Sequence, residues 1–219
     1  MGKNNTKIFS EYSWKLSFYI WFKNIIDFFL GALGCFFLLP IWLILRIAYW
    51  LEADYAPVIY QQTRVGKDGK SFRIFKFRSM VPDAEEKLKK LLYKEPYRSE
   101  WDAHQKLSND PRITRVGKIL RQTSFDELPQ MINLLLGQMS LVGPRPLVEG
   151  ELEHHNGDPI YQRIRPGITG WWAVNGRPNV DYEKRLELEY YYIKNISLIF
   201  DMKIILMTVR VIFQGTGTE

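Results

Sequence analysis

The sequence predicts an α+β protein, mainly helical with a short β-hairpin, in which an N-terminal Pro-kinked re-entrant membrane helix is attached to one cytosolic domain. Three observations predict this class: an uncharged apolar run, two strand-like segments around a glycine turn, and several segments with helical periodicity. The expected order is an interfacial segment at 1–22, the membrane helix at 23–52, the cytosolic domain at 53–195 and a C-terminal interfacial or packing helix at 196–219.

The apolar run, Phe28–Leu45, has 18 residues without a charge, close to the roughly 20 that a membrane-spanning helix needs. Pro40 lies inside the run, and proline removes a backbone N–H and clashes with the preceding turn, so we expect a bend there. Basic residues flank the run on both sides, and basic flanks are typical of the cytoplasmic face. These features favour a re-entrant helix with both ends in the cytoplasm over a simple span.

Composition is consistent with a membrane-bound protein that has one folded domain. The chain has 219 residues, 46% of them hydrophobic, and a formal net charge of +6. About 165 residues outside the membrane segment suffice for one ordinary core. The excess of basic over acidic residues is consistent with binding to anionic lipid headgroups and to phosphorylated ligands. Nucleic acid is not a predicted partner, because the sequence has neither zinc-finger spacing nor an aromatic RNA-binding signature.

Val58–Arg64 and Ser71–Phe77 are the two strand-like segments, and a glycine-bearing turn at 66–70 joins them. This pattern predicts a β-hairpin. Lys76 and Arg78 lie at the end of the second strand, where both cations could face an anionic ligand. Alternating charge is also typical of the solvent-exposed face of a strand, so both interpretations stay open.

Helices are predicted at 82–93, with early acids and late lysines, and at 181–194. The polar stretch at 97–109 predicts a surface connector. The apolar stretch at 196–213 is interrupted by charges, which favours an interfacial or core helix over a second membrane span.

Asp126 and Glu127 are adjacent carboxylates, and an acidic pair can act as nucleophile, metal ligand or base. Ser124-x-x-Glu127 is also a capping box, and Pro129 fits the first turn of a helix. This interpretation places both acids at a helix N-terminus, where ionised acids and bound phosphate are favoured. A structural cap and a catalytic pair account equally well for these residues.

Arg145 lies between Pro144 and Pro146, shortly after the acidic pair. The two prolines stiffen its backbone, and a fixed arginine is a natural phosphate clamp. Together with the acidic pair, this turn indicates phosphoryl transfer as the candidate chemistry.

Further motifs extend along most of the chain. In order they are Lys23-x-x-x-Asp27, Gln62-x-Arg64-Val-Gly66, Lys76-Phe77-Arg78-Ser79-Met80, Asp110-Pro-Arg112, Arg121-x-Thr-Ser124-x-Asp126-Glu127-Leu-Pro-Gln130, Gly143-Pro-Arg-Pro146, Arg165-Pro-Gly-Ile-Thr-Gly170 and Asn175-Gly-Arg177. From about Lys23 to Val211, the sequence resembles the bacterial sugar transferases, the monotopic polyprenyl-phosphate phosphoglycosyl transferases.

The resemblance implies that Asp126 attacks the β-phosphorus of a UDP-sugar, that UMP leaves, and that undecaprenyl phosphate then removes the phosphosugar from the aspartate. It implies Mg²⁺ at Asp126, with Glu127 as a second acid that assists the metal or the incoming phosphate. Candidate anion contacts are Arg145, Arg112, Arg121, Lys76 and Arg78.

The resemblance also implies a bacterial inner membrane location with the catalytic domain facing the cytoplasm. Residues 106–112 and 147–151 resemble the galactose-transferring branch, so galactose 1-phosphate is the expected cargo, with glucose or an N-acetylated diamino sugar as alternatives. The sequence leaves open whether the chain forms a homodimer. Two other classes are the alternatives: a conventional glycosyltransferase that releases UDP, and a noncatalytic membrane scaffold.

Overall fold

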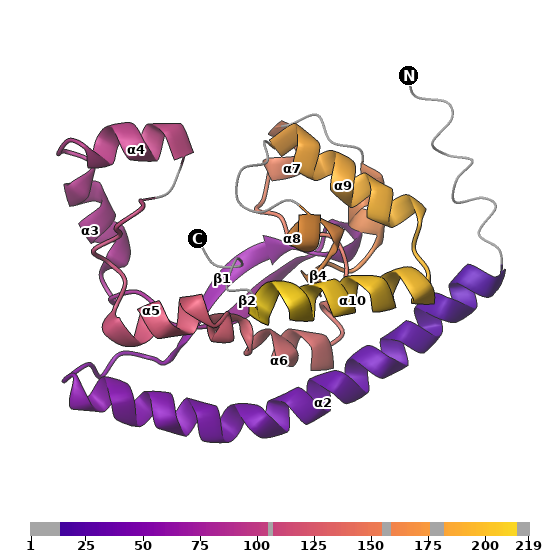
Figure 1. The fold of residues 1–219 in the computed structure, drawn as a ribbon, viewed down its shortest axis with the longest axis horizontal. Coiled ribbons are helices and arrows are strands. Elements are labelled where there is room, and N and C mark those ends of the chain that lie inside the picture. Colours follow the sequence, from indigo (N-terminus) through magenta and orange to yellow (C-terminus); the bar gives the residue numbers. More distant parts are fainter. Residues whose placement is uncertain (1–13, 105–106, 155–158, 176–181, 214–219) are drawn as a thin grey trace.

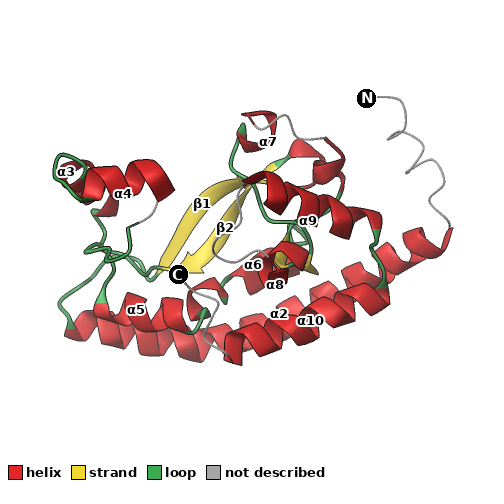
Figure 2. Cartoon of the chain, turned by 45° about the horizontal axis from the view of Figure 1, so that its top comes forward, coloured by secondary structure: helices red, strands yellow, loops and turns green. Residues whose placement is uncertain are grey.

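The computed structural model describes residues 14–104, 107–154, 159–175 and 182–213. One long helix, α2 (Trp14–Leu51), runs along one side of the molecule, and the remaining elements lie over it (Figure 1). Helices dominate the described residues, and the sheets are small (Figure 2). The predicted mainly helical α+β class is confirmed at this level.

Helix α2 begins before the expected start at Lys23 and continues as one helix through Pro40. Residues 1–13 of the expected interfacial segment lie outside the described residues. Leu16–Leu51 is long and apolar enough to cross a membrane, and 11% of its 18-residue apolar window is buried. Because the core helix of a soluble protein is mostly buried, this exposed apolar surface indicates membrane association.

The predicted hairpin is confirmed: β1 (Ile59–Val65) pairs antiparallel with β2 (Ser71–Phe77), in a register from Ile59↔Phe77 to Val65↔Ser71. The turn contains a short 3₁₀ segment, Lys67–Gly69, and Gly69 has a φ of +73°. Glycine adopts this left-handed conformation without a steric penalty, so it closes the turn.

A second, parallel pair joins β3 (Ser140–Val142) and β4 (Gly167–Thr169), which the sequence analysis did not predict. Each strand has three residues, too few for an alternating pattern to stand out. The pair lies beside a hydrophobic cluster that includes Val142, Tyr192 and Ile204.

Between the hairpin and the acidic pair lie α3 (Ala84–Leu91), α4 (Tyr97–His104) and α5 (Arg115–Gln122). The expected surface connector at 97–109 is therefore partly wrong, because its first half is helical. Thr114 caps α5, since its side chain accepts the Gly117 N–H at 2.8 Å.

The C-terminal part contains α7 (Glu151–His154), a 3₁₀ turn (Pro159–Arg163), α8 (Trp171–Asn175), α9 (Tyr182–Lys194) and α10 (Leu198–Phe213). Helix α9 confirms the helix predicted at 181–194. Asp201 and Ile204 of α10 are buried, whereas Ile199 and Leu206 are exposed. Helix α10 is thus a packing helix with one exposed apolar side.

Helix α6 (Gln130–Leu135) packs directly on α2 (Figure 1). The contact is close because Gly31 has no side chain: a Cβ there would lie 2.5 Å from the backbone nitrogen of Leu135. Since α6 follows the acidic pair in the chain, this contact fixes the pair relative to the long apolar helix.

Candidate active site

Asp126 lies in a single 3₁₀ turn, Phe125–Glu127, between α5 and α6. Ser124 precedes it with a φ of +58°, and its side chain makes no capping hydrogen bond. The predicted capping box is therefore wrong, and α6 begins only at Gln130. The left-handed Ser124 reverses the chain direction instead, so the two acids occupy a separate tight turn ahead of the helix.

Two elements, β2 and α5, bring basic side chains to this turn. Lys76, near the end of β2, forms an ion pair with Glu127, with 2.8 Å between Nζ and Oε1. These side chains are 30% and 35% exposed, so the pair is accessible to a ligand. Arg121, at the end of α5, donates from Nε to the Ser79 hydroxyl at 2.9 Å.

Burial is the main influence on Asp126, and it raises the pKa of this carboxyl above its ordinary value. The positive charge of Lys76 opposes this rise in pKa, Glu127 adds to it, and Arg121 opposes it. The acids precede α6 in their own turn, so the expected placement at a helix N-terminus is not observed, and burial dominates the pKa of Asp126. A half-buried carboxylate near two cations can act as a nucleophile toward an anionic phosphate, because the cations favour both the ionised acid and the ligand.

Arg112 lies next to this cluster. Burial is the main cause of the lowered pKa of Arg121, and the positive charge of Arg112 also lowers this pKa. The Arg112 guanidinium is buried and binds Asp110, with 2.6 Å between Nη2 and Oδ2. Arg112 also lines an open groove of about 290 Å³ together with Lys87, Lys90 and Lys94.

Arg78 has a structural environment that differs from the expected phosphate contact. Its Nη1 pairs with Asp54 at 2.8 Å, its Nε donates to the Pro57 carbonyl at 2.8 Å, and its guanidinium stacks over the Tyr49 ring at 4.4 Å. The side chain is buried, so Arg78 joins the end of α2 to the hairpin.

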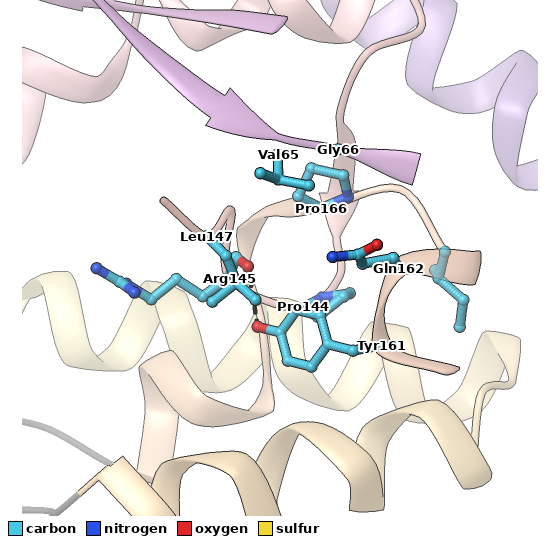
Figure 3. A pocket seen from close by; sticks show the side chains of 9 residues that line it. Val65, Gly66, Pro144, Arg145, Leu147, Tyr161, Gln162 and Pro166 are labelled. Atoms are coloured by element: carbon cyan, nitrogen blue, oxygen red, sulfur yellow. Dashed lines mark hydrogen bonds between the residues drawn. The ribbon is translucent and has the colours of Figure 1, made fainter. Parts of the chain in front are cut away.

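Arg145 lies among a different set of residues. Its Nη1 pairs with Glu151 at 2.7 Å, and its backbone oxygen accepts the Tyr161 hydroxyl at 2.9 Å. Figure 3 shows Tyr161 against the turn at Pro144, while the Arg145 side chain extends away from it. Of the five basic residues expected at the site, Lys76 and Arg121 influence Asp126 directly, Arg112 adjoins them, and Arg78 and Arg145 have other partners within the described residues.

The sequence model of one protein family, described as bacterial sugar transferase, matches residues 18–215. The chain belongs to this family. It is 47% identical over 177 residues to the undecaprenyl-phosphate galactose phosphotransferase of Salmonella typhimurium, a match that covers 80% of this chain and 37% of that protein.

Other relatives of this sugar transferase carry related names. It is 42% identical over 168 residues to the exopolysaccharide production protein ExoY of Rhizobium meliloti, covering 76% of this chain and 74% of that one. It is 39% identical over 196 residues to the UDP-glucose:undecaprenyl-phosphate glucose-1-phosphate transferase of Escherichia coli. This match covers 85% of this chain and 39% of that protein. The chain spans 37–41% of the length of several longer relatives.

The acidic pair of the sugar transferase suits a hard divalent cation. Mg²⁺ binds one or two carboxylates and completes its coordination with water and substrate phosphate oxygens. Asp126 and Glu127 offer such a donor set, and the described residues contain no group of three or more His, Cys, Asp or Glu side chains that could form a closed protein cage. The donor chemistry of this pair therefore fits Mg²⁺.

The sequence analysis did not identify two residues that hydrogen-bond to the backbone of Arg145, namely Tyr161 and Glu189. Glu189 lies between the buried apolar positions Leu186 and Ile193 on α9. An acid on the apolar face of a predicted helix is a signal that could have identified it. Arg177 and Lys106, which belong to motifs named above, lie outside the described residues.

Proposed function

We propose that this sugar transferase moves a hexose 1-phosphate from a UDP-sugar to undecaprenyl phosphate and releases UMP, as the first membrane step of surface polysaccharide synthesis. The observation that carries the proposal is the half-buried Asp126 carboxyl next to the Lys76–Glu127 ion pair, within the electrostatic influence of Lys76 and Arg121. The names of the relatives support the donor, the lipid acceptor and the polysaccharide context.

In the first step, an Asp126 oxygen forms a bond to the β-phosphorus of the donor, and the bond from that phosphorus to the UMP oxygen breaks. UMP leaves with the electron pair. In the second step, an oxygen of undecaprenyl phosphate attacks the same phosphorus, and the Asp126 carboxylate departs from it. Lys76 and Arg121 lie where they can offset the charge on the phosphoryl oxygens during both steps.

Asp126 and Glu127 would hold Mg²⁺, which supplies neutralisation of the phosphate charge when bound. Lys76 then has two roles in this chain. It orients Glu127 through the ion pair, and it favours the ionised form of Asp126.

The membrane part of the proposal is that α2 enters the inner membrane from the cytoplasm, bends at Pro40 and returns, so that the catalytic domain faces the cytoplasm. The exposed apolar side chains of α2 and its basic flanks support this. Single cysteines at Lys15 and Glu52, introduced in a Cys35→Ser background, test it by labelling with a membrane-impermeant reagent. Both positions should label from the cytoplasmic side; labelling from opposite sides would establish a span.

Asp126→Asn keeps the shape of the side chain but removes the nucleophile, so transfer should fall by at least about a thousandfold. The matched control is Asp102→Asn, because Asp102 is an exposed acid paired with Arg98. The measurement is UMP release from UDP-galactose with Mg²⁺, with and without undecaprenyl phosphate. Without acceptor, the wild-type enzyme should release about one UMP per enzyme and retain the phosphosugar on Asp126.

Release of UDP in the same assay would indicate a conventional glycosyltransferase. Normal transfer by Asp126→Asn would remove Asp126 from the mechanism. We propose galactose 1-phosphate as the cargo, and a panel of UDP-sugars in this assay identifies the sugar, with UDP-glucose as the principal competitor.

A further inference from the structure

Glu189 is a buried acid that the proposed chemistry does not use. It lies on α9 with 1% of its surface exposed, and its Oε1 accepts the backbone N–H of Arg145 at 3.0 Å. Its Oε2 has no hydrogen-bond partner among the residues the structure describes. A carboxyl in this position is costly to bury, since each polar oxygen loses its contact with water.

Arg145 has both of its backbone polar groups bound by side chains. Glu189 accepts the N–H. The Tyr161 hydroxyl donates to the carbonyl oxygen at 2.9 Å (Figure 3). Pro144 and Pro146 flank the residue, and a proline restricts its own φ and the backbone of the residue before it. The conformation of Arg145 is therefore set from α9, from the 3₁₀ turn and from both neighbours.

Glu189 does not serve as the main counter-ion of the Arg145 side chain. The Arg145 guanidinium pairs with Glu151, which also binds Arg185 at 3.2 Å. Burial raises the pKa of Glu189 to about 8. The charged and titratable groups that influence it are Arg145, Tyr161 and Arg185. At neutral pH the Glu189 carboxyl thus acts as a neutral hydrogen-bond acceptor for the backbone.

We propose that Glu189 is a positioning residue for donor recognition: together with Tyr161 it fixes the backbone of Arg145, so that the Arg145 guanidinium is presented to the anionic diphosphate of the nucleotide sugar. This inference rests on the proposed function, because that function supplies the nucleotide-sugar donor, and it adds Arg145 as a contact of the donor diphosphate. It explains why a buried acid occupies a position where an apolar side chain would pack without an unpaired oxygen.

The test compares Glu189→Leu, Glu189→Gln and Tyr161→Phe in the full-length membrane enzyme. Glu189→Leu removes the acceptor but fills the apolar site, so the KM for the UDP-sugar should rise roughly tenfold with kcat nearly unchanged. Glu189→Gln keeps an acceptor oxygen and should retain a KM within about threefold of the wild-type value. Tyr161→Phe keeps the ring and should raise the donor KM in the same direction as Glu189→Leu.

The control is Glu187→Leu, an exposed acid on the same helix, which should leave the donor KM unchanged. The melting temperature and the KM for undecaprenyl phosphate are measured for every variant, since a general structural defect would change these as well. In an Arg145→Ala background, Glu189→Leu should add little further loss, because its effect passes through Arg145.

An unchanged donor KM in Glu189→Leu, or full additivity with Arg145→Ala, would overturn the inference. Equilibrium binding of UDP to the purified enzyme gives a second readout that does not depend on transfer. Absence of UMP release from every UDP-sugar would defeat the proposed function, whereas weaker UDP binding by Glu189→Leu and Tyr161→Phe would still support the role of Glu189. If Glu189→Leu does not fold, Tyr161→Phe decides the question. Wild-type values of its UDP affinity and donor KM would reject the shared positioning role.

Discussion

Arg165 donates from Nη2 to Asp27 Oδ2 at 3.0 Å, which joins the strand-bearing part of the domain to the middle of the long helix. The two side chains are 15% and 2% exposed, so this ion pair is almost completely buried. Asp27 Oδ1 also accepts the backbone N–H of Leu141 at 3.0 Å. One carboxylate of α2 therefore binds residues at both β3 and the chain leading into β4.

Asp27→Ala should lower the free energy of unfolding by roughly 3 kcal/mol, because it removes the carboxylate that neutralises the buried Arg165 guanidinium. Chemical unfolding in detergent measures the loss. The control is Glu187→Ala, which breaks the exposed pair with Lys184 and should change stability by less than about 0.5 kcal/mol. Equal effects of the two substitutions would contradict the importance of the buried pair.

Arg78→Lys should reduce stability by about 2 kcal/mol, because lysine cannot bind Asp54 and the Pro57 carbonyl from two separate nitrogens. The KM for the donor should stay the same, since these contacts are structural. A raised donor KM with unchanged stability would instead support the phosphate contact of Arg78 that the sequence suggested. Thermal unfolding and donor titration of the same preparation distinguish these results.

Lys76→Met should move the acidic limb of the pH–activity profile toward higher pH. Lys76 opposes the raised pKa of Asp126, so its loss raises that pKa further and lowers the fraction of ionised nucleophile at acidic pH. Lys118→Met, a substitution in α5, serves as the control for loss of one positive charge. A profile that keeps its midpoint would show that Lys76 does not act on Asp126.

Gly31→Ala should destabilise the contact between α2 and α6 by about 1–3 kcal/mol, because the new methyl group meets the backbone of Leu135. Gly34→Ala is the matched substitution. Its methyl group would lie 2.5 Å from Met131 Cγ and 2.9 Å from Met131 Cβ. Rotation of the Met131 side chain relieves the first contact and a small shift of α6 relieves the second, so the loss of stability should be smaller than for a clash with backbone. Comparing the melting temperatures of the two variants tests this order.

Glu189→Gln should change how stability depends on pH. The pKa of Glu189 is raised from an ordinary 4.5 to about 8 in the folded chain, so its contribution is greatest below 4.5 and is lost as pH rises to about 8. The variant lacks this loss. Relative to the wild type, its free energy of unfolding should therefore rise by a few kcal/mol between pH 4.5 and about 8. Melting temperatures at pH 5 and pH 8 measure the difference, and parallel curves would contradict the assignment.

Local patterns predicted the hairpin and a helix at 181–194, which the structure shows at Tyr182–Lys194, because each forms from neighbouring residues with a clear period. The same patterns missed β3 and β4, whose pairing joins segments that are distant in the chain. They also assigned a cap to Ser124 from spacing alone, whereas the backbone of Ser124 is left-handed, with a φ of +58°, and its side chain makes no capping hydrogen bond.

At the candidate site, the sequence identified the acids but could not rank the basic residues. Lys76, Arg78 and Arg121 all lie near motif positions, and only the fold shows that Arg78 is bound by Asp54 while Lys76 faces Glu127. Burial decides these roles, because a desolvated arginine needs a fixed partner, and burial depends on contacts between distant elements.

The contact between Gly31 and Leu135 also has a consequence for where the reaction takes place. An apolar helix in a bilayer settles at a depth set by the length of its hydrophobic surface. In the proposed arrangement, with α2 in the bilayer, that depth would also set the height of Asp126 relative to the lipid phosphates, because α6 touches α2 backbone to backbone. Bilayer thickness would then influence how well a lipid-borne phosphate reaches the carboxylate, without any change in the residues that bind it.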